Sequence, residues 1–141
     1  MSYHKKFSNF RPDTIFRTKL LIRGWKNADE QSRWDKMHLW VIFMSTNLGM
    51  DCPRLVRDSN ANAGYYLVRE NEIHMSKPSI ITLIHEFRHA MQAQGKAGNW
   101  QDVEHDARGW SLSLYYKVAP KSLKKLVSEG MVFHVDDSDF E

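Results

Sequence analysis

The chain has little of several features that mark other classes of protein. Its 141 residues include one cysteine, Cys52, which cannot form an internal disulfide and favours a reducing cytoplasm. No apolar run approaches the ~20 residues of a membrane-spanning helix, and residues 1–10 are polar and basic, unlike a secretory signal. No internal repeat or low-complexity linker divides the sequence. We therefore expect one cytoplasmic domain over residues 1–141, with no membrane partner.

Charge is unevenly distributed along the chain, although the net charge is only +3. Residues 1–26 form a basic N-terminal segment with a single acid, Asp13, whereas residues 136–141 form an acidic tail. Aromatic residues interleave with the basic ones, which would suit nucleic-acid binding by stacking. No nucleic-acid-binding motif is present, however, so docking of these aromatic side chains on the protein core is the favoured interpretation.

The strongest chemical signal lies in residues 85–89, which read H-E-x-x-H. The flanking residues predict a helix, because Ser79 can cap its start and Gly95 can end it. On this helix His85 and His89 lie one turn apart on the same face, so both can bind one metal ion. Apolar residues recur at three- and four-residue steps through the same segment, namely Ile80, Leu83, Ile84, Phe87 and Met91.

Zinc is the metal that this pattern predicts, as the cofactor of a hydrolytic site. A bound Zn2+ lowers the pKa of its water towards ~7. Glu86 is rotated about 100° from His85 around the helix, so it can take the proton of that water without being a ligand. The alternative is an ordinary amphipathic helix with two surface histidines, in which the pattern is accidental.

A catalytic zinc site usually has three protein ligands and one open position. A second helical pattern over residues 101–118 follows a short loop, so its first turn is expected beside the histidine helix. Glu104, His105 and Asp106 all lie in that turn. We favour Glu104 because Ala107, three residues further on the same face, allows close packing. Asp106 is the next choice, and His105 is the last.

With these residues the sequence resembles the gluzincin metallopeptidases, in which a glutamate on a following helix completes H-E-x-x-H. Several gluzincin families carry that glutamate in an E-x-x-A context, as Glu104 and Ala107 do here. The resemblance extends over residues 64–116. It implies a compact zincin-like fold, bound Zn2+ and hydrolysis of a protein substrate. The chain departs from the pattern at Arg108, where many gluzincins have an acid that orients a metal-bound histidine; another group must orient it here.

Strand patterns precede the histidine helix and predict a hairpin, with a turn at residues 70–71. The edge of such a hairpin can bind an extended peptide. The predicted class is α+β: an N-terminal helix, a small and mostly antiparallel sheet, the H-E-x-x-H helix and the glutamate helix. The expected strands cover residues 53–57, 65–68, 72–75 and 131–135. The expected N-terminal helix covers residues 28–48, and a further short helix is expected over residues 121–129.

The expected function is zinc-dependent cleavage of a peptide bond, with Glu86 as general base and later as proton donor. The alternative is a regulatory or nucleic-acid-associated protein whose zinc site is structural or inactive. A fourth protein ligand would favour that alternative, with His105, His134 and Cys52 as candidates. The sequence does not decide which side chain would stabilise the oxyanion. The candidates are Tyr115, Tyr116, His105, His74 and Arg88.

Overall fold

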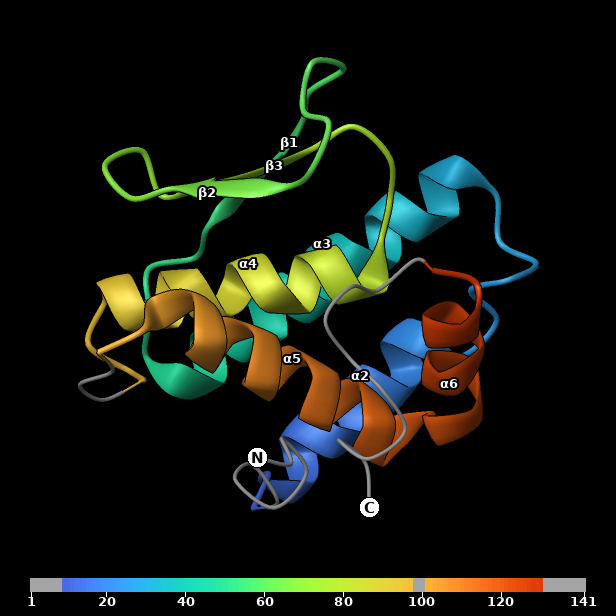
Figure 1. Ribbon diagram of the computed structural model, residues 1–141. Helices are drawn as coiled ribbons and strands as arrows, with labels where there is room; N and C mark the ends of the chain where they lie inside the picture. Colours follow the sequence, from blue (N-terminus) through green and yellow to red (C-terminus); the bar gives the residue numbers. More distant parts are fainter. Residues whose placement is uncertain (1–8, 98–100, 131–141) are drawn as a thin grey trace.

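The computed structural model describes residues 9–97 and 101–130, which form five helices and three strands (Figure 1). This composition confirms the predicted α+β class. The expected last strand, the acidic tail and His134 lie outside the described residues. The elements are α2 (Pro12–Ile22), α3 (Glu30–Leu48), β1 (Arg54–Arg57), β2 (Tyr65–Leu67), β3 (Glu72–Met75), α4 (Ile80–Ala93), α5 (Val103–Val118) and α6 (Pro120–Ser128).

The three strands form a mixed sheet in the order β1-β3-β2. The predicted hairpin is present, with β2 antiparallel to β3 and Tyr65 opposite His74. The expectation of a mostly antiparallel sheet is wrong, because β1 pairs parallel to β3, with Leu55 opposite Ile73. The reason is the connection through residues 58–64, which reverses the chain and passes over one strand position. That position is later filled by β3.

Helix α4 begins and ends as the sequence predicts. The Ser79 side chain accepts a hydrogen bond from the backbone N–H of Thr82 at its start. Gly95, with a φ of 72°, adopts the left-handed conformation just beyond its end. The predicted apolar residues of this helix are all buried in the core, from Ile80 to Met91. Their burial leaves the two histidines at the margin of the core, where both are partly accessible.

The basic N-terminal segment contains a helix, α2, that was not predicted from the sequence. It packs against α3, where the indole Nε1 of Trp40 donates a hydrogen bond of 3.1 Å to Thr18 Oγ1. Phe10 and Trp25 pack on the core, in keeping with the docking interpretation, whereas Phe16 is exposed. Two of the three aromatic side chains that the structure describes in this segment are therefore packed on the core rather than displayed for stacking on bases.

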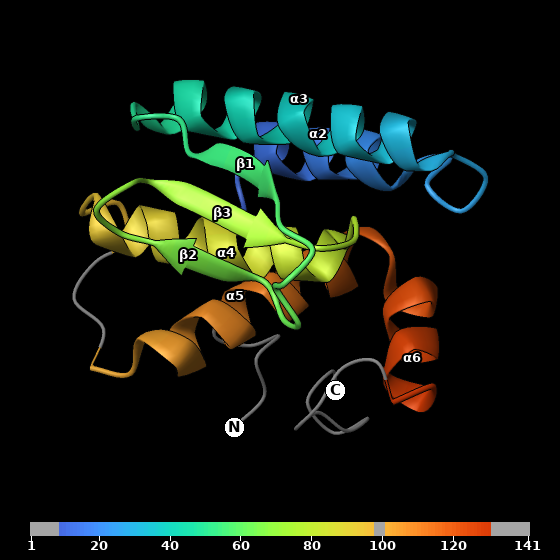
Figure 2. The same ribbon diagram turned by 90° about the horizontal axis from the view of Figure 1, so that it is seen from above.

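The sheet covers α4, and α5 runs along another side of α4 (Figures 1 and 2). Helix α3 lies beside the β1 edge of the sheet, where the Arg57 guanidinium packs over the Trp34 ring, and α2 packs against α3 and α5 (Figure 2). Trp40 of α3 packs edge-to-face against Phe87 of α4, with ring centroids 5.0 Å apart. Helix α4 thus lies centrally and contacts α3, α5 and the sheet. Among the described residues, no helix combines the length and the apolar character needed to cross a lipid bilayer.

Candidate metal centre

The side chains of His85, His89 and Glu104 converge at the junction of α4 and α5. Glu104 Oε1 lies 2.6 Å from His89 Nε2, and Glu104 Oε2 lies 3.3 Å from His85 Nε2. The two imidazole rings meet nearly edge-to-face, with centroids 5.0 Å apart. The ligand atoms of the three residues all lie within 4.8 Å of one another. The structure therefore brings together the three residues that the sequence proposes as a ligand set.

This donor set fits a zinc ion by chemistry and by spacing. Zinc prefers imidazole nitrogen and carboxylate oxygen at ~2 Å, so tetrahedral ligands lie about 3.3 Å from one another. The donors of His85, His89 and Glu104 are grouped on that scale. Within the described part of the chain no other histidine, cysteine or acid completes a group of this kind. Of the alternative fourth ligands, Cys52 is exposed on the segment before β1.

Glu86 lies against this group but is more deeply buried than the three donors. Its side chain is 9% exposed, and Oε2 lies 3.9 Å from His85 Nε2. Burial, reinforced by the negative charge of Glu104, raises the pKa of the Glu86 carboxyl to about 8. A bound cation would act in the opposite direction and favour the carboxylate. Glu86 is thus a carboxyl group whose protonation depends on the charge placed beside it.

Asp106 takes no part in the donor group, in contrast to its standing as second choice for the third ligand. It is fully buried, and its two oxygens accept hydrogen bonds of 2.9 and 3.1 Å from the guanidinium of Arg88. Gln92 also donates to Asp106, at 2.8 Å. Arg88 and Asp106 therefore form a buried, two-pronged ion pair that joins α4 to α5 immediately behind the histidines.

Gln92 is the group that contacts the second ring nitrogen of His89, a task for which many gluzincins use an acid at the position of Arg108. Its Oε1 lies 2.7 Å from His89 Nδ1, and its Nε2 donates to Asp106 and to the carbonyl of Val103. An acceptor on Nδ1 leaves Nε2 of His89 available to a metal. The sequence reasoning missed Gln92, although its position three residues after His89 on one helix is a signal for such a contact.

A cleft of about 890 Å³ opens over the donor group. Its floor is formed by α4 and α5, and one wall is formed by the segment leading into β2 and by β2 itself. Apolar side chains at its rim are exposed to an unusual degree: Val68 is 67% exposed and Val103 is 47% exposed. Concave sites with apolar walls and a few convergent polar groups are typical of binding sites for organic ligands.

The proposed oxyanion donors are placed elsewhere, because none of the five lines the cleft. Arg88 is paired with Asp106, and His74 lies on the outer face of the sheet. Polar residues that were not considered as oxyanion donors line the cleft instead, among them Arg108 and Ser111. Arg108 follows Glu104 by one helical turn, so the E-x-x-A-x pattern itself places it beside the metal ligands.

The wall of the cleft lies very close to α4 at Gly64. A Cβ atom on Gly64 would lie 2.2 Å from Thr82 Cγ2 and 3.2 Å from the carbonyl oxygen of His74. It would also lie 3.7 Å from Glu86 Cγ. Only glycine leaves room for this approach, because 2.2 Å is far inside van der Waals contact. The position of the β2 edge above the Glu86 carboxyl therefore depends on Gly64.

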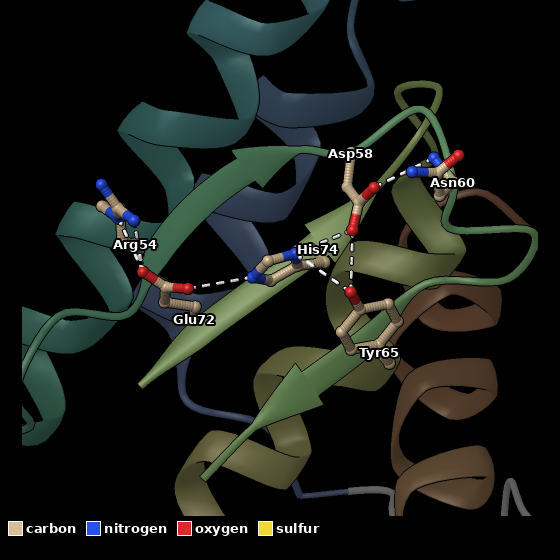
Figure 3. Close-up of polar contacts among 6 residues, drawn as sticks. All are labelled: Arg54, Asp58, Asn60, Tyr65, Glu72 and His74. Carbon is tan, nitrogen blue, oxygen red and sulfur yellow. Dashed lines mark hydrogen bonds and ion pairs between the residues drawn. The ribbon is translucent and has the colours of Figure 1, made fainter. Parts of the chain in front are cut away.

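A second histidine–carboxylate cluster lies on the outer face of the sheet (Figure 3). His74 Nδ1 lies 3.2 Å from Asp58 Oδ2, and His74 Nε2 lies 3.0 Å from Glu72 Oε1. Tyr65 stacks on the His74 ring and donates a 2.8 Å hydrogen bond to Asp58. Arg54 donates from Nε to Glu72 at 2.9 Å. Both nitrogens of His74 are therefore already bonded to carboxylates.

The gluzincin resemblance depends on four side chains, which are His85, Glu86, His89 and Glu104. In the structure three of them present donors to a common point and the fourth lies buried beside it. This geometry is the basis for any functional conclusion about the chain. No protein-family model, no curated protein and no solved structure matches this chain.

Proposed function

We propose that this protein is a zinc-dependent metallopeptidase of the compact, zincin-like gluzincin type, which hydrolyses a peptide bond in a protein substrate. The observation that carries the proposal is the convergence of His85, His89 and Glu104 within 4.8 Å beside the buried carboxyl of Glu86. The exposed single thiol of Cys52 fits action in a reducing cytoplasm.

Each residue of the site has a distinct task in this proposal. When bound, zinc supplies Lewis acidity, which lowers the pKa of a coordinated water and polarises a carbonyl group. Glu86 accepts the proton of the attacking water and then delivers it to the leaving amine. Burial raises its pKa in the metal-free protein, and a bound cation would lower that pKa and favour the carboxylate form, which can accept a proton. Gln92 holds the His89 ring in the orientation that exposes Nε2.

Strand β2 gives the cleft a way to hold an extended peptide. It is an edge strand of the sheet, and residues Tyr65 and Tyr66 line the cleft. A peptide that adds to such an edge gains backbone hydrogen bonds, while alternate side chains enter the cleft. Gly64, just before β2, lies so close to α4 that a side chain would not fit there, and Glu86 is among the residues that it approaches. A peptide paired with this edge would therefore pass close to Glu86.

A hydrolytic site fits the donor group better than a structural zinc site does. Structural zinc is almost always held by four protein ligands, whereas catalytic zinc keeps one position for water. Three donors converge in the described part of the chain, and the cleft opens directly over them. The carboxylate of Glu104 is 59% exposed, which also places the group at a surface that substrate can reach.

The test is the Glu86→Gln variant, since glutamine keeps the shape of the side chain but cannot accept the proton. We expect one zinc per chain in both proteins by elemental analysis, and cleavage of a peptide library by the wild type alone. A Glu86→Gln protein that binds zinc and cleaves at the wild-type rate would refute the proposed role of Glu86. A wild type without stoichiometric zinc would refute the metal centre.

A further inference from the structure

Arg108 lies in the cleft beside the metal-ligand group. It follows Glu104 by one turn of α5 and lines the cleft together with His85 and Ser111. Its side chain is half-buried.

The guanidinium of Arg108 has no ion-pair partner among the described side chains, unlike those of Arg88 and Arg54. Arg88 is bound to Asp106, and Arg54 is bound to Glu72. Glu104, at the i−4 position, turns its oxygens to the two histidines instead of to Arg108. A planar fork of N–H donors that no carboxylate of the described residues contacts is suited to bind a carboxylate of a ligand.

The charge balance of the cleft supports the same ligand chemistry. Arg108 is the only lysine or arginine among the described residues that line it, and the acids there are Glu86 and Glu104. A bound divalent cation would offset those two carboxylates and leave the charge of Arg108 in excess. The loaded site would then carry a net positive charge and attract an anion.

We propose that Arg108 binds a carboxylate of the peptide substrate and so makes the site selective for an acidic residue, or a free C-terminus, close to the cleaved bond. The proposal rests on the proposed peptidase function. Four residues of helix span about 6 Å, and an extended peptide rises about 3.3 Å per residue. The bound carboxylate therefore belongs to the chain within about two residues of the cleaved bond.

The first arm of the test measures binding without turnover. Zinc-loaded Glu86→Gln protein is immobilised and used to select peptides from a randomised octapeptide library, made once with free C-termini and once with C-terminal amides. We expect enrichment of aspartate and glutamate, or of free C-termini, and loss of that enrichment in the Glu86→Gln/Arg108→Gln protein. Enrichment in the amide library identifies the side chain as the source of the carboxylate. Enrichment that requires the free C-terminus identifies the chain end.

The second arm measures cleavage of the same libraries by wild type, Arg108→Gln and Arg108→Lys. A charge-assisted hydrogen-bond pair corresponds to a preference of about tenfold to a hundredfold, and Arg108→Gln should remove it. Arg108→Lys should keep part of it, because a lysine retains the charge but not the fork. Arg69→Gln is the matched control, since Arg69 is exposed on the turn between β2 and β3 and does not line the cleft. Metal content and circular dichroism establish that each variant is folded and loaded.

The outcomes separate this inference from the proposed function. If Arg108→Gln lowers kcat equally for all peptides and leaves their ranking unchanged, the carboxylate role is overturned and Arg108 acts on the reacting carbonyl. If wild type selects and cleaves peptides with no preference for acids or free C-termini, the inference is also overturned while the peptidase proposal survives. If no peptide is cleaved, the peptidase proposal fails, and the binding arm alone decides whether Arg108 selects carboxylates.

Discussion

Two clusters in this protein combine histidine with carboxylates, and they differ in what their nitrogen atoms are free to do. In the cluster between α4 and α5, the Nε2 atoms of His85 and His89 point to one exposed carboxylate, Glu104. In the cluster on the outer face of the sheet, both ring nitrogens of His74 are bonded to separate acids, Asp58 and Glu72 (Figure 3). In the first cluster two histidine nitrogens meet at one carboxylate, whereas in the second the two nitrogens of one histidine contact acids on either side of it.

The pKa shifts of the two clusters run in opposite directions. Burial, with the charge of the neighbouring His89, lowers the pKa of His85. Burial also acts to lower the pKa of His74, but the hydrogen bonds to Glu72 and Asp58 outweigh it, and the net shift is upward. His85 is thus kept neutral, as a metal ligand must be, and His74 is favoured as an imidazolium. The pKa of the histidine is therefore lowered in the candidate metal centre and raised in the ion-paired cluster.

The largest expected effect separates the two clusters by metal content. His85→Ala and His89→Ala should each abolish stoichiometric zinc binding, since two remaining ligands hold zinc poorly. His74→Ala should leave the zinc content at one per chain, because the donors of His74 face carboxylates outside the cleft. Elemental analysis after gel filtration measures this directly. Loss of zinc in His74→Ala, or its retention in both other variants, would contradict the distinction.

A second prediction separates the two acids that compete for the role of third ligand. Asp106→Ala removes the carboxylate that pairs with the buried Arg88 guanidinium, so the metal-free protein should lose about 3–5 kcal/mol of stability. Glu104→Ala removes a side chain that is 59% exposed, and it should weaken zinc affinity with little change in the stability of the metal-free protein. Urea unfolding in the presence of a chelator and zinc titration against a competing chelator give the two quantities. A destabilised Glu104→Ala protein with intact zinc affinity would reverse the assignment.

The elements predicted correctly are those that local sequence determines. Ser79 caps α4, its apolar residues recur at helical spacing, and residues 65–75 alternate as a hairpin does. The position of Glu104 beside the histidines could be predicted because a short loop brings the next helix back to them. All of these signals act over a few residues, or over one helix–loop–helix unit.

The features that were missed depend on contacts between distant segments. Helix α2 shows no apolar stripe, because two of its three buried residues are Thr14 and Thr18, and the Thr18 hydroxyl is recognised by Trp40. The parallel pairing of β1 depends on the path of the chain between strands. Arg88 and Asp106 each look like solvent-facing charges in the sequence; they meet only because α4 and α5 pack face to face.

A third prediction concerns Glu86 in the metal-free protein. Its folded pKa of about 8 lies above the ordinary value of 4.5, so the folded state binds more protons than the unfolded state between those values. Stability therefore falls as pH rises through this window. Glu86→Gln removes the loss, and the variant should exceed the wild type by about 3 kcal/mol at pH 9, less than the shift alone implies because a buried site relaxes on ionisation.

The measurement for Glu86 is urea unfolding in chelator-treated buffer at pH 5.5 and pH 9. The difference in unfolding free energy between Glu86→Gln and wild type should grow with pH. A control on the second cluster is Glu72→Gln, whose carboxylate has a pKa lowered mainly by the hydrogen bond from His74. Neutralising Glu72 should not produce a gain at high pH. A constant difference across the range would show that Glu86 is not a buried, proton-retaining carboxyl.

A smaller effect is expected at Gln92, which supports the metal cluster without belonging to it. Gln92→Ala removes the acceptor 2.7 Å from His89 Nδ1. Loss of such a supporting contact typically costs about 10–100-fold in metal affinity. Gln92→Glu keeps an acceptor at the same place and should restore most of that affinity, although it gives up the donation to Asp106. Zinc affinities that are equal in wild type and Gln92→Ala would mean that the His89 ring needs no external orientation.

The smallest effect is expected at His74. Because its folded pKa is raised, its ion pairs contribute stability that is fully present below the unfolded value of 6.5 and is lost as pH rises through the folded pKa. His74→Gln should therefore lower stability by at most about 1 kcal/mol at pH 5.5, since pairs near the surface are weak, and by less at pH 9. The Tyr65 ring, which stacks on His74, would lose its support in the same variant. Unfolding free energies at the two pH values test the sign, and a loss that is larger at pH 9 would show that His74 is neutral in the folded protein.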